Sequence, residues 1–205
     1  MLHPSLVPQQ ISETLGHGLV AQRPLPRGTI VWVRDALDQT VPQETLAALP
    51  QPLRELVRIY SYIDRHGQFV MPWDHGRFEN HSCAPNCLMT GYDFEIAVRD
   101  IEAGEQVTGD YALYNLEPPW TCQCHSSGCR GRILWQDRLR LAEDWDRQLR
   151  NALPSLMRVE QPLWLLVAEQ REVLSAMADV SRMRSCAHNF FVSPQTSGKI
   201  VGNRC

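Results

Sequence analysis

Eleven residues near the middle of the chain, Arg77-Phe-Glu-Asn-His-Ser-Cys-Ala-Pro-Asn-Cys87, decide the interpretation of this sequence. They crowd two thiols, an imidazole and several hydrogen-bonding side chains around a proline. Judged by residue type alone, the segment is either a capping and turn cluster, which Asn, Ser and Pro favour, or a Cys/His nucleophilic pair. Periodicity does not separate the two interpretations.

A second cysteine group follows in Cys122-Gln-Cys-His-Ser-Ser-Gly-Cys129, which places three thiols within a polar loop. Free cysteines are normally buried singly, so three unliganded small hydrophobes are the weaker interpretation. A structural zinc site needs four ligands, and the fourth must come from elsewhere in the fold. The candidates for this position are nearby thiols and imidazoles: Cys83, Cys87, His81 and His125.

Two further segments carry weaker signals. Gly16-His17-Gly18 offers two glycines where a backbone could approach a ligand closely. Ala103-Gly-Glu-Gln-Val-Thr-Gly-Asp-Tyr111 ends a predicted strand with an acid and a phenol. A Gly-x-Gly is common in turns, and a tyrosine after an aspartate is usually a packed ring, so neither segment is informative alone.

Taken in order, the four segments resemble the SET-domain family of S-adenosylmethionine-dependent protein lysine methyltransferases, including its zinc-binding post-SET segment. The resemblance spans roughly residues 10 to 134. It rests on Gly16-His-Gly18, Arg77-Phe-x-Asn-His-Ser-Cys-x-Pro-Asn-Cys87, Gly104-Glu-x-x-x-x-Asp-Tyr111 and Cys122-x-Cys-x-x-x-x-Cys129-Arg-Gly131.

The resemblance implies a β-clip (SET) fold, mainly β with α. Small antiparallel sheets would be joined by a pseudoknot-like threading of the Asn80-His81 segment with the C-terminal strand, which is a rare topology. The expected organisation is a SET domain at 1–115, a post-SET segment at 116–134, a helical appendage at 135–184 and a flexible tail at 185–205.

The resemblance also implies a role for each motif residue. The cofactor S-adenosyl-L-methionine would be bound by Gly16, His17, Gly18, Arg77, Asn80 and His81. Tyr111 would be catalytic and lie beside the transferring methyl group. A structural zinc would be held by Cys83, Cys122, Cys124 and Cys129.

Hydrophobic patterning adds elements that the motifs do not cover. Short apolar runs predict strands at 18–22, 29–33, 68–71, 86–90 and 94–98, the last two forming a hairpin. Apolar residues at helical spacing from Pro52 to Ile63 predict one helix, and the spacing returns after residue 132 to predict a helical hairpin.

Composition limits the possible functions. The chain has 205 residues, 43% hydrophobic and 21% charged, as soluble globular proteins do, and its formal net charge of −3 predicts no direct nucleic-acid binding. No apolar run approaches the roughly 20 residues of a membrane span, and no export signal is visible. We therefore expect a cytoplasmic protein; the alternative is an exported effector.

Seven cysteines, five of them between Cys83 and Cys129, indicate a metal site rather than a disulfide framework.

One departure from the family concerns the number of methyl groups added. Gly109 stands two residues before Tyr111, where the family usually has Phe or Tyr. We expect a roomier lysine channel that permits more than one methyl group, unless Tyr114 or Tyr92 fills the gap. The family's aromatic-x-Gly-Glu element, which lines its substrate groove, is not visible before Arg77.

The leading interpretation is methyl transfer to a lysine side chain of a protein or peptide substrate. The alternative is a catalytically inactive SET-like binding module that zinc stabilises. A third possibility is a structural zinc module that binds a partner through Trp135, Trp145 and Trp164, although amphipathic helices more often bury such residues. Lys199, the single lysine, is a candidate for self-methylation.

Overall fold

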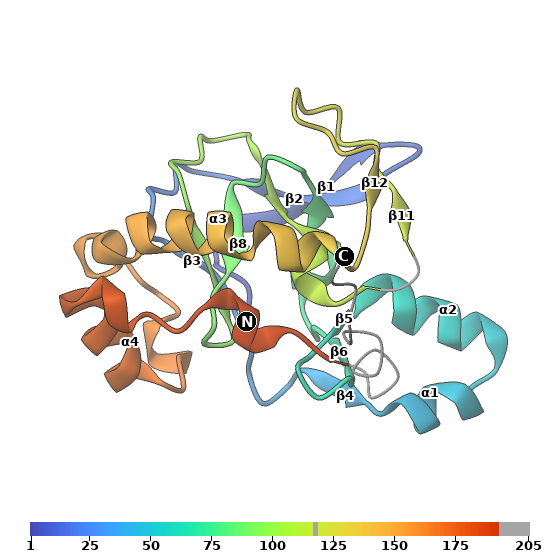
Figure 1. Cartoon of the computed structure of the whole chain (residues 1–205). Coiled ribbons are helices and arrows are strands. Elements are labelled where there is room, and N and C mark those ends of the chain that lie inside the picture. Colours follow the sequence, from blue (N-terminus) through green and yellow to red (C-terminus); the bar gives the residue numbers. More distant parts are fainter. Residues whose placement is uncertain (117–118, 193–205) are drawn as a thin grey trace, which may run out of the picture.

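The computed structural model describes residues 1–116 and 119–192, and its strands form small sheets rather than one large one (Figure 1). The first sheet has the order β1 (Leu6–Ser12), β2 (Gly16–Ala21), β10 (Gln106–Gly109), β7 (Asn80–His81). The second sheet has the order β3 (Ile30–Val33), β9 (Phe94–Ala97), β8 (Cys87–Met89). The third has the order β4 (Gln39–Val41), β6 (Phe69–Met71), β5 (Tyr62–Ile63). The fourth is the pair β11 (Trp120–Thr121) and β12 (Arg132–Ile133). This architecture confirms the expected fold class.

One parallel pairing brings two distant motifs together. Strands β10 and β7 pair in parallel, with Thr108 opposite Asn80 and Gly109 opposite His81, whereas the other named pairs are antiparallel. Asn86, which is 1% exposed, fixes this junction: its Nδ2 donates to the Gln106 carbonyl, and its Oδ1 accepts from the Thr108 N–H. The Asn80-His81 segment therefore lies beside the strand that leads to Tyr111.

The hairpin predicted at 86–90 and 94–98 is present as β8 and β9. Cys87 pairs with Ala97 and Met89 pairs with Glu95. All four residues of β9 are buried, so the strand has no solvent face and Glu95 lies within the core.

Two helices precede the central motif. The predicted helix is α2 (Gln51–Tyr60), with Pro52 in its first turn, where a missing N–H costs no hydrogen bond. It ends before Ile63 because that residue pairs with Phe69 in β5 and β6. A shorter helix, α1 (Gln43–Ala48), was not predicted; it lies beside α2 on one side of the molecule (Figure 1).

The helical segment after residue 135, expected as a helical appendage, packs against the β core. Its helices α3 (Asp137–Ala152) and α4 (Gln170–Ala178) supply buried residues to the same hydrophobic cluster as β3, β8 and β9. Trp145 is 3% exposed within this cluster, and Trp164 packs against it, which agrees with the core interpretation of these tryptophans. The segment completes the core, because one face of the β3-β9-β8 sheet would otherwise be uncovered.

Part of the expected flexible tail is packed. The backbone N–H of Cys186 donates to Asp146 Oδ1 at 2.8 Å, and Asn189 Nδ2 donates to the Thr90 carbonyl at 2.6 Å. Both residues are buried, and they lie in a short 3-10 helix, Cys186–Asn189. Residues 193–205, including Lys199, lie outside the described residues. No helix in the described part of the chain is long and apolar enough to cross a membrane.

A buried histidine near the start of the chain predicts acid sensitivity. His3 is 1% exposed, its Nδ1 accepts from the Ser5 N–H, and burial lowers its pKa to about 4. As pH falls from 6.5 towards 4, unfolded His3 takes up a proton that folded His3 does not, so the free energy of unfolding decreases. Urea unfolding at pH 7 and pH 5 should show a smaller decrease for His3→Asn than for the wild type. The exposed His66→Asn variant serves as control; equal pH dependence of His3→Asn and wild type would contradict this account.

Candidate functional site

Three of the four predicted zinc ligands converge. Cys83 follows β7, and Cys122 and Cys124 lie in the loop between β11 and β12. Their ligand atoms, together with a ring nitrogen of His81, all lie within 4.8 Å of one another, and the Cys83 and Cys122 sulfurs are 3.7 Å apart. Two thiolates about 2.3 Å from a tetrahedral zinc would be separated by about 3.8 Å. The spacing of these sulfurs therefore fits zinc.

The other candidate zinc ligands, Cys129, Cys87 and His125, lie outside the set of mutually close ligand atoms. Cys129 hydrogen-bonds to Cys122 and accepts from the Gly131 N–H at 3.4 Å, but it is exposed and outside the mutually close set. Cys87 is excluded, because it is fully buried in β8 and its thiol donates to Glu79 Oε1 at 3.0 Å. His125 has a positive φ of 54° and also lies outside the close set.

His81 lies beside the cluster as a hydrogen-bond donor. Its Nδ1 accepts the Tyr111 backbone N–H at 3.2 Å, and its Nε2 lies 3.3 Å from Cys83 Sγ. Burial lowers its pKa to about 4, so the ring is neutral and carries one proton. With Nδ1 acting as acceptor, this proton is on Nε2 and points at the sulfur. The network thus assigns His81 to orienting Cys83, as the second shell of many metal sites does.

The thiols of the cluster differ in acidity: burial raises the pKa of Cys83 and Cys122, whereas the pKa of Cys124 is lowered. Burial raises the pKa of Cys124, but hydrogen bonds from Ser126 and from the Cys83 backbone N–H outweigh it and lower the pKa to about 6. Cys83 Sγ also accepts the Arg130 N–H at 3.4 Å. Backbone N–H groups directed at sulfur stabilise the thiolates that a metal requires.

A buried ion pair connects the cysteine cluster to Tyr111. Arg130 follows Cys129, and its Nη2 donates to Asp110 Oδ1 at 2.6 Å. Asp110 is 1% exposed and also accepts the Ala112 N–H, which caps the 3-10 helix Tyr111–Tyr114. The zinc-site candidates and Tyr111 are therefore held by one network. Sequence reasoning missed the roles of Asp110 and Arg130, although both adjoin motif residues.

Five of the six predicted cofactor-binding residues lie in β2 and β7, the two strands on either side of β10. Asn80 Nδ2 donates to the His17 carbonyl at 3.1 Å. A Cβ added at Gly18 would lie 2.7 Å from Asn80 Nδ2 and 2.5 Å from Gln106 Nε2, so only glycine allows this close approach. Gly16 has φ of +68°, which glycine adopts without strain.

A large pocket opens next to this junction. It encloses about 710 Å³ of empty space, its open mouth included, and Tyr111 lies in its wall. Of the predicted cofactor residues only Arg77 lines it; the other five belong to the junction. The Tyr111 ring packs on His81 at 5.3 Å and on Trp120 at 5.2 Å between centroids, so it contacts both the junction and the pocket. Further aromatic residues line the pocket: Tyr60, Tyr62, Tyr114 and Trp120.

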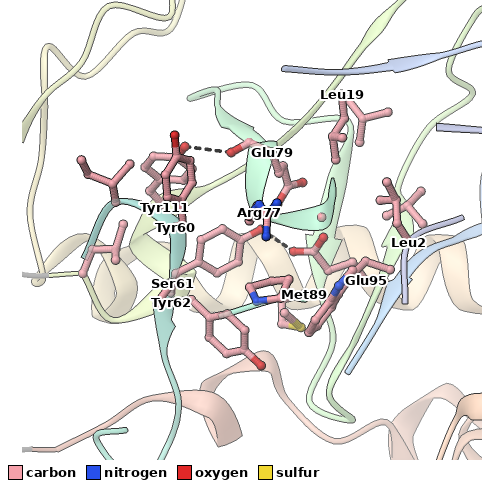
Figure 2. Close-up of a pocket in the computed structure, with 18 of the residues that line it drawn as sticks. Leu2, Leu19, Tyr60, Ser61, Tyr62, Arg77, Glu79, Met89, Glu95 and Tyr111 are labelled. Carbon is pink, nitrogen blue, oxygen red and sulfur yellow. Dashed lines mark hydrogen bonds between the residues drawn. The ribbon is translucent and has the colours of Figure 1, made fainter. Parts of the chain in front are cut away.

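The Tyr111 hydroxyl has a defined orientation. It donates to the Glu79 backbone carbonyl at 2.8 Å, as the dashed line in Figure 2 shows. Burial raises the pKa of Tyr111, so the phenol keeps its proton. Because this proton is already donated, the phenolic oxygen is available to a ligand as an acceptor.

The gap expected at Gly109 is filled. A Cβ added there would overlap the Tyr114 hydroxyl and lie 3.0 Å from Glu79 Oε1. Tyr92 is elsewhere, with its hydroxyl accepting the Arg184 N–H at 2.8 Å. Tyr114 therefore occupies the space that Gly109 leaves, and the expected roomier channel is not present on this side of the pocket.

Two acids in the pocket, the buried Glu95 and the half-buried Glu79, were missed by sequence reasoning. Glu79 and Glu95 line it, and the Tyr114 hydroxyl hydrogen-bonds to both carboxyls. Burial raises the pKa of Glu79, and burial together with the Glu79 charge raises the pKa of Glu95 further. A charged residue inside the apolar run Phe94-Glu-Ile-Ala-Val98 was the available signal, because acids are rarely buried without a partner.

Comparison with known proteins gives a consistent family assignment. The sequence model of the SET domain matches residues 16–112. "Histone-lysine N-methyltransferase ASHR3" of Arabidopsis thaliana is 42% identical over 64 residues, which cover 28% of this chain and 13% of that protein. "Histone-lysine N-methyltransferase ash1" of Drosophila melanogaster is 41% identical over 66 residues, 28% of this chain and 3% of that protein.

A longer match extends into the helical segment. "Histone-lysine N-methyltransferase, H3 lysine-36 specific" of Schizosaccharomyces pombe is 25% identical over 176 residues, which cover 79% of this chain and 21% of that protein. The chain thus spans between 3% and 21% of the length of these three relatives.

Proposed function

The chain belongs to the SET domain family, and we propose that it transfers a methyl group from S-adenosyl-L-methionine to a lysine side chain of a protein. The observation that carries this proposal is the position of Tyr111, whose ring contacts both the Asn80-His81 junction and the aromatic pocket. A tyrosine shared by two adjoining sites suits a reaction in which two ligands must meet.

The junction has groups that fit the cofactor. The side chains of Asn80 and Gln106 pack directly on the buried backbone of Gly18, which fixes the position of Asn80 at the junction. Asn80 is partly exposed and uses one N–H on His17, so its second N–H and its carbonyl remain for ligand groups. Gly16, His17, Gly18, Asn80 and His81 would hold the cofactor. Arg77 would contribute from the pocket side rather than from the junction.

The residues of the pocket would act mainly by positioning. When bound, the cofactor supplies a methyl group on a positively charged sulfur. The Tyr111 hydroxyl donates its proton to the Glu79 backbone carbonyl, so its oxygen is an acceptor. It can accept weak C–H hydrogen bonds from a polarised methyl group, or a hydrogen bond from an N–H group of the amine. Tyr60, Tyr62 and Trp120 would surround the aliphatic part of a lysine and exclude water. Holding two reactants in line accounts for up to roughly 7 to 11 kcal/mol of a barrier.

Zinc would act structurally in this proposal. The candidate ligands Cys83, Cys122, Cys124 and Cys129 fasten the post-SET loop to the residue that follows Asn80-His81-Ser82. Occupation of the site would therefore fix the junction without taking part in methyl transfer. The formal net charge of −3 supports a protein substrate without direct nucleic-acid contact.

A methyl-transfer assay tests the proposal. The purified chain is incubated with S-adenosylmethionine carrying a labelled methyl group and with a library of lysine-containing peptides, including the tails of histones, which the names of the relatives suggest. We expect label on lysine side chains. Stoichiometric cofactor binding without label on any peptide or on a whole-cell protein extract would support the inactive binding module instead.

A further inference from the structure

The last described residues lie beside the pocket. The backbone N–H of Phe191 donates to Asn115 Oδ1 at 2.9 Å, and Leu116, the residue after Asn115, lines the pocket. The Phe191 ring also lies against Gly67, in the turn between β5 and β6. Figure 1 shows the red ribbon of these last residues running towards β5 and β6. The chain therefore leaves its described part next to the wall of the pocket.

Lys199 is close enough along the chain to enter this pocket. It follows Phe191 by eight residues, which span at most about 28 Å when extended. The Cα atoms of Phe191 and Leu116 are separated by one asparagine side chain, one hydrogen bond and one backbone step, or about 12 Å at most. Leu116 lies in the pocket wall, so chain length allows Lys199 to reach the pocket of its own molecule.

The residues around Lys199 suit such an approach. Lys199 is the single lysine of the sequence, and residues 193–198, Ser-Pro-Gln-Thr-Ser-Gly, carry no charge and no large apolar side chain. Arg58 and Arg77 also line the pocket, and they would repel a segment with several cations. Between residues 193 and 203 Lys199 is the only charged side chain, so this repulsion is small.

The mouth of the pocket has an exposed apolar rim. Ile59 and Trp120 line the pocket and are 61% and 42% exposed. Leu56, one turn before Ile59 in α2, is 50% exposed. We call Leu56, Ile59 and Trp120 the rim. Exposed apolar side chains beside a cavity are typical of a binding surface, because water leaves them when a partner binds.

The sequence after Lys199 matches the rim. Ile200 and Val201 follow Lys199 directly, and they are the only large apolar residues in 193–205. A lysine inside the aromatic pocket would leave its neighbours at the mouth, where the rim offers apolar contact. The order of the segment, a cation followed by two apolar side chains, thus agrees with the order of the site, a pocket followed by a rim.

We propose that the chain binds its own residues 198–201 at the pocket and rim and methylates Lys199. The inference rests on the proposed lysine methyl transfer and names a substrate for it. The lone pair of the neutral Lys199 amine forms the N–C bond to the methyl group, the electron pair of the breaking S–C bond stays on sulfur, and one N–H proton passes to water. A substrate on the same chain acts at an effective concentration of about a millimolar, which favours it over a second molecule.

NMR of the single lysine tests the binding step without cofactor or turnover. The full chain, made with ¹⁵N-lysine, gives one backbone amide signal, that of Lys199. We expect this signal away from its position in a free peptide of residues 193–205. Ile59→Ser, which removes apolar surface from the rim, should move the signal towards the free-peptide position. Leu165→Ser is the matched control and should leave the signal unchanged, because Leu165 is 87% exposed and does not line the pocket.

Mass spectrometry of the protein incubated with labelled S-adenosylmethionine tests the transfer step. We expect label on Lys199, at a rate per chain that changes less than about twofold over an about 100-fold range of protein concentration, because the reaction lies within one molecule. A rate per chain that rises in proportion to concentration would assign Lys199 to a second copy and overturn the proposal. Lys199→Arg, which keeps the charge, should carry no label and should still transfer label to added peptides.

The two readouts separate this inference from the proposed function. A Lys199 amide signal at the free-peptide position in the wild type would overturn the inference, as would label on added peptides without label on Lys199. Label on neither Lys199 nor any peptide, with the amide signal displaced, would refute the proposed function and with it the methylation of Lys199, and would leave only the binding of residues 198–201.

Discussion

Replacing Cys122 by serine is expected to remove zinc from the protein and to abolish binding of S-adenosylmethionine with it. Cys122 is the centre of the cysteine cluster: its sulfur lies 3.7 Å from that of Cys83 and hydrogen-bonds to Cys124 and Cys129. Serine provides no thiolate, so we expect zinc affinity to fall about 100-fold or more. Without the metal, Cys83 is released, and it lies only two residues after His81.

Zinc per chain after dialysis against a chelator measures the effect, and calorimetry measures cofactor binding. Cys186→Ala is the matched control, because Cys186 is a fully buried thiol outside the cluster; it should retain one zinc per chain. Most of the hydrophobic core lies away from the cluster, so the variant should still unfold cooperatively. Full zinc content in Cys122→Ser would contradict the assignment.

Cys129→Ser decides the fourth ligand position. The structure leaves Cys129 just outside the mutually close set and places His81 within it. The hydrogen bond from Tyr111 to His81 Nδ1 directs the Nε2 proton at Cys83, so we expect Cys129 to complete the site and its replacement to release zinc. Retention of one zinc per chain by Cys129→Ser would instead assign the position to His81.

Tyr111→Phe is expected to lower methyl transfer about 100-fold while changing cofactor affinity less than about threefold. The variant loses the phenolic oxygen and with it the 2.8 Å hydrogen bond to the Glu79 carbonyl, which fixes the ring. A small misplacement of reactants alone can cost a factor of about 100 in rate. The ring itself stays, so its contacts with His81 and Trp120 are retained.

Steady-state rates and calorimetric titration of the same preparations separate the two effects. Tyr92→Phe, which removes a buried tyrosine hydroxyl outside the pocket, serves as control and should keep the wild-type rate. A loss of cofactor affinity as large as the loss of rate would assign Tyr111 to binding rather than to the reaction.

Much of the site could be predicted because its residues are carried by short motifs. Cys83, Cys122 and Cys124 were expected together and lie together, and the parallel pairing of β7 with β10 places Asn80 and His81 beside the strand before Tyr111. Such motifs combine residue types that are rare together, so a few positions suffice to indicate the fold.

The hydrogen-bonded cluster of Glu79, Tyr114 and Glu95 could not be predicted, for a physical reason. Glu79, Tyr114 and Glu95 are separated by 15 residues or more, and although an acid inside an apolar run marks Glu95 as unusual, the sequence does not show which side chains meet it. Their mutual hydrogen bonds exist only because β8 and β9 place Glu95 in the core, opposite Met89. Likewise Gly109 suggested an open channel unless Tyr114 or Tyr92 filled the gap, and sequence spacing alone does not show that Tyr114 does so.

The residues that the helical segment packs against could not be predicted, for a similar reason. Its apolar periodicity predicted helices correctly, but periodicity shows only that a face is buried and not what covers it. Leu149, Leu153 and Leu156 pack in one cluster with Ile96, so the boundary expected at residue 135 does not divide the core.

The central claim is that the Asn80-His81 junction binds S-adenosylmethionine. It is tested most directly by calorimetric titration of zinc-quantified protein, comparing the wild type with Asn80→Ala. At one zinc per chain, the account predicts one cofactor per chain bound by the wild type and binding weakened at least about tenfold by the substitution. Absence of binding by the wild type with its zinc in place would contradict the account and leave a metal-stabilised interaction module.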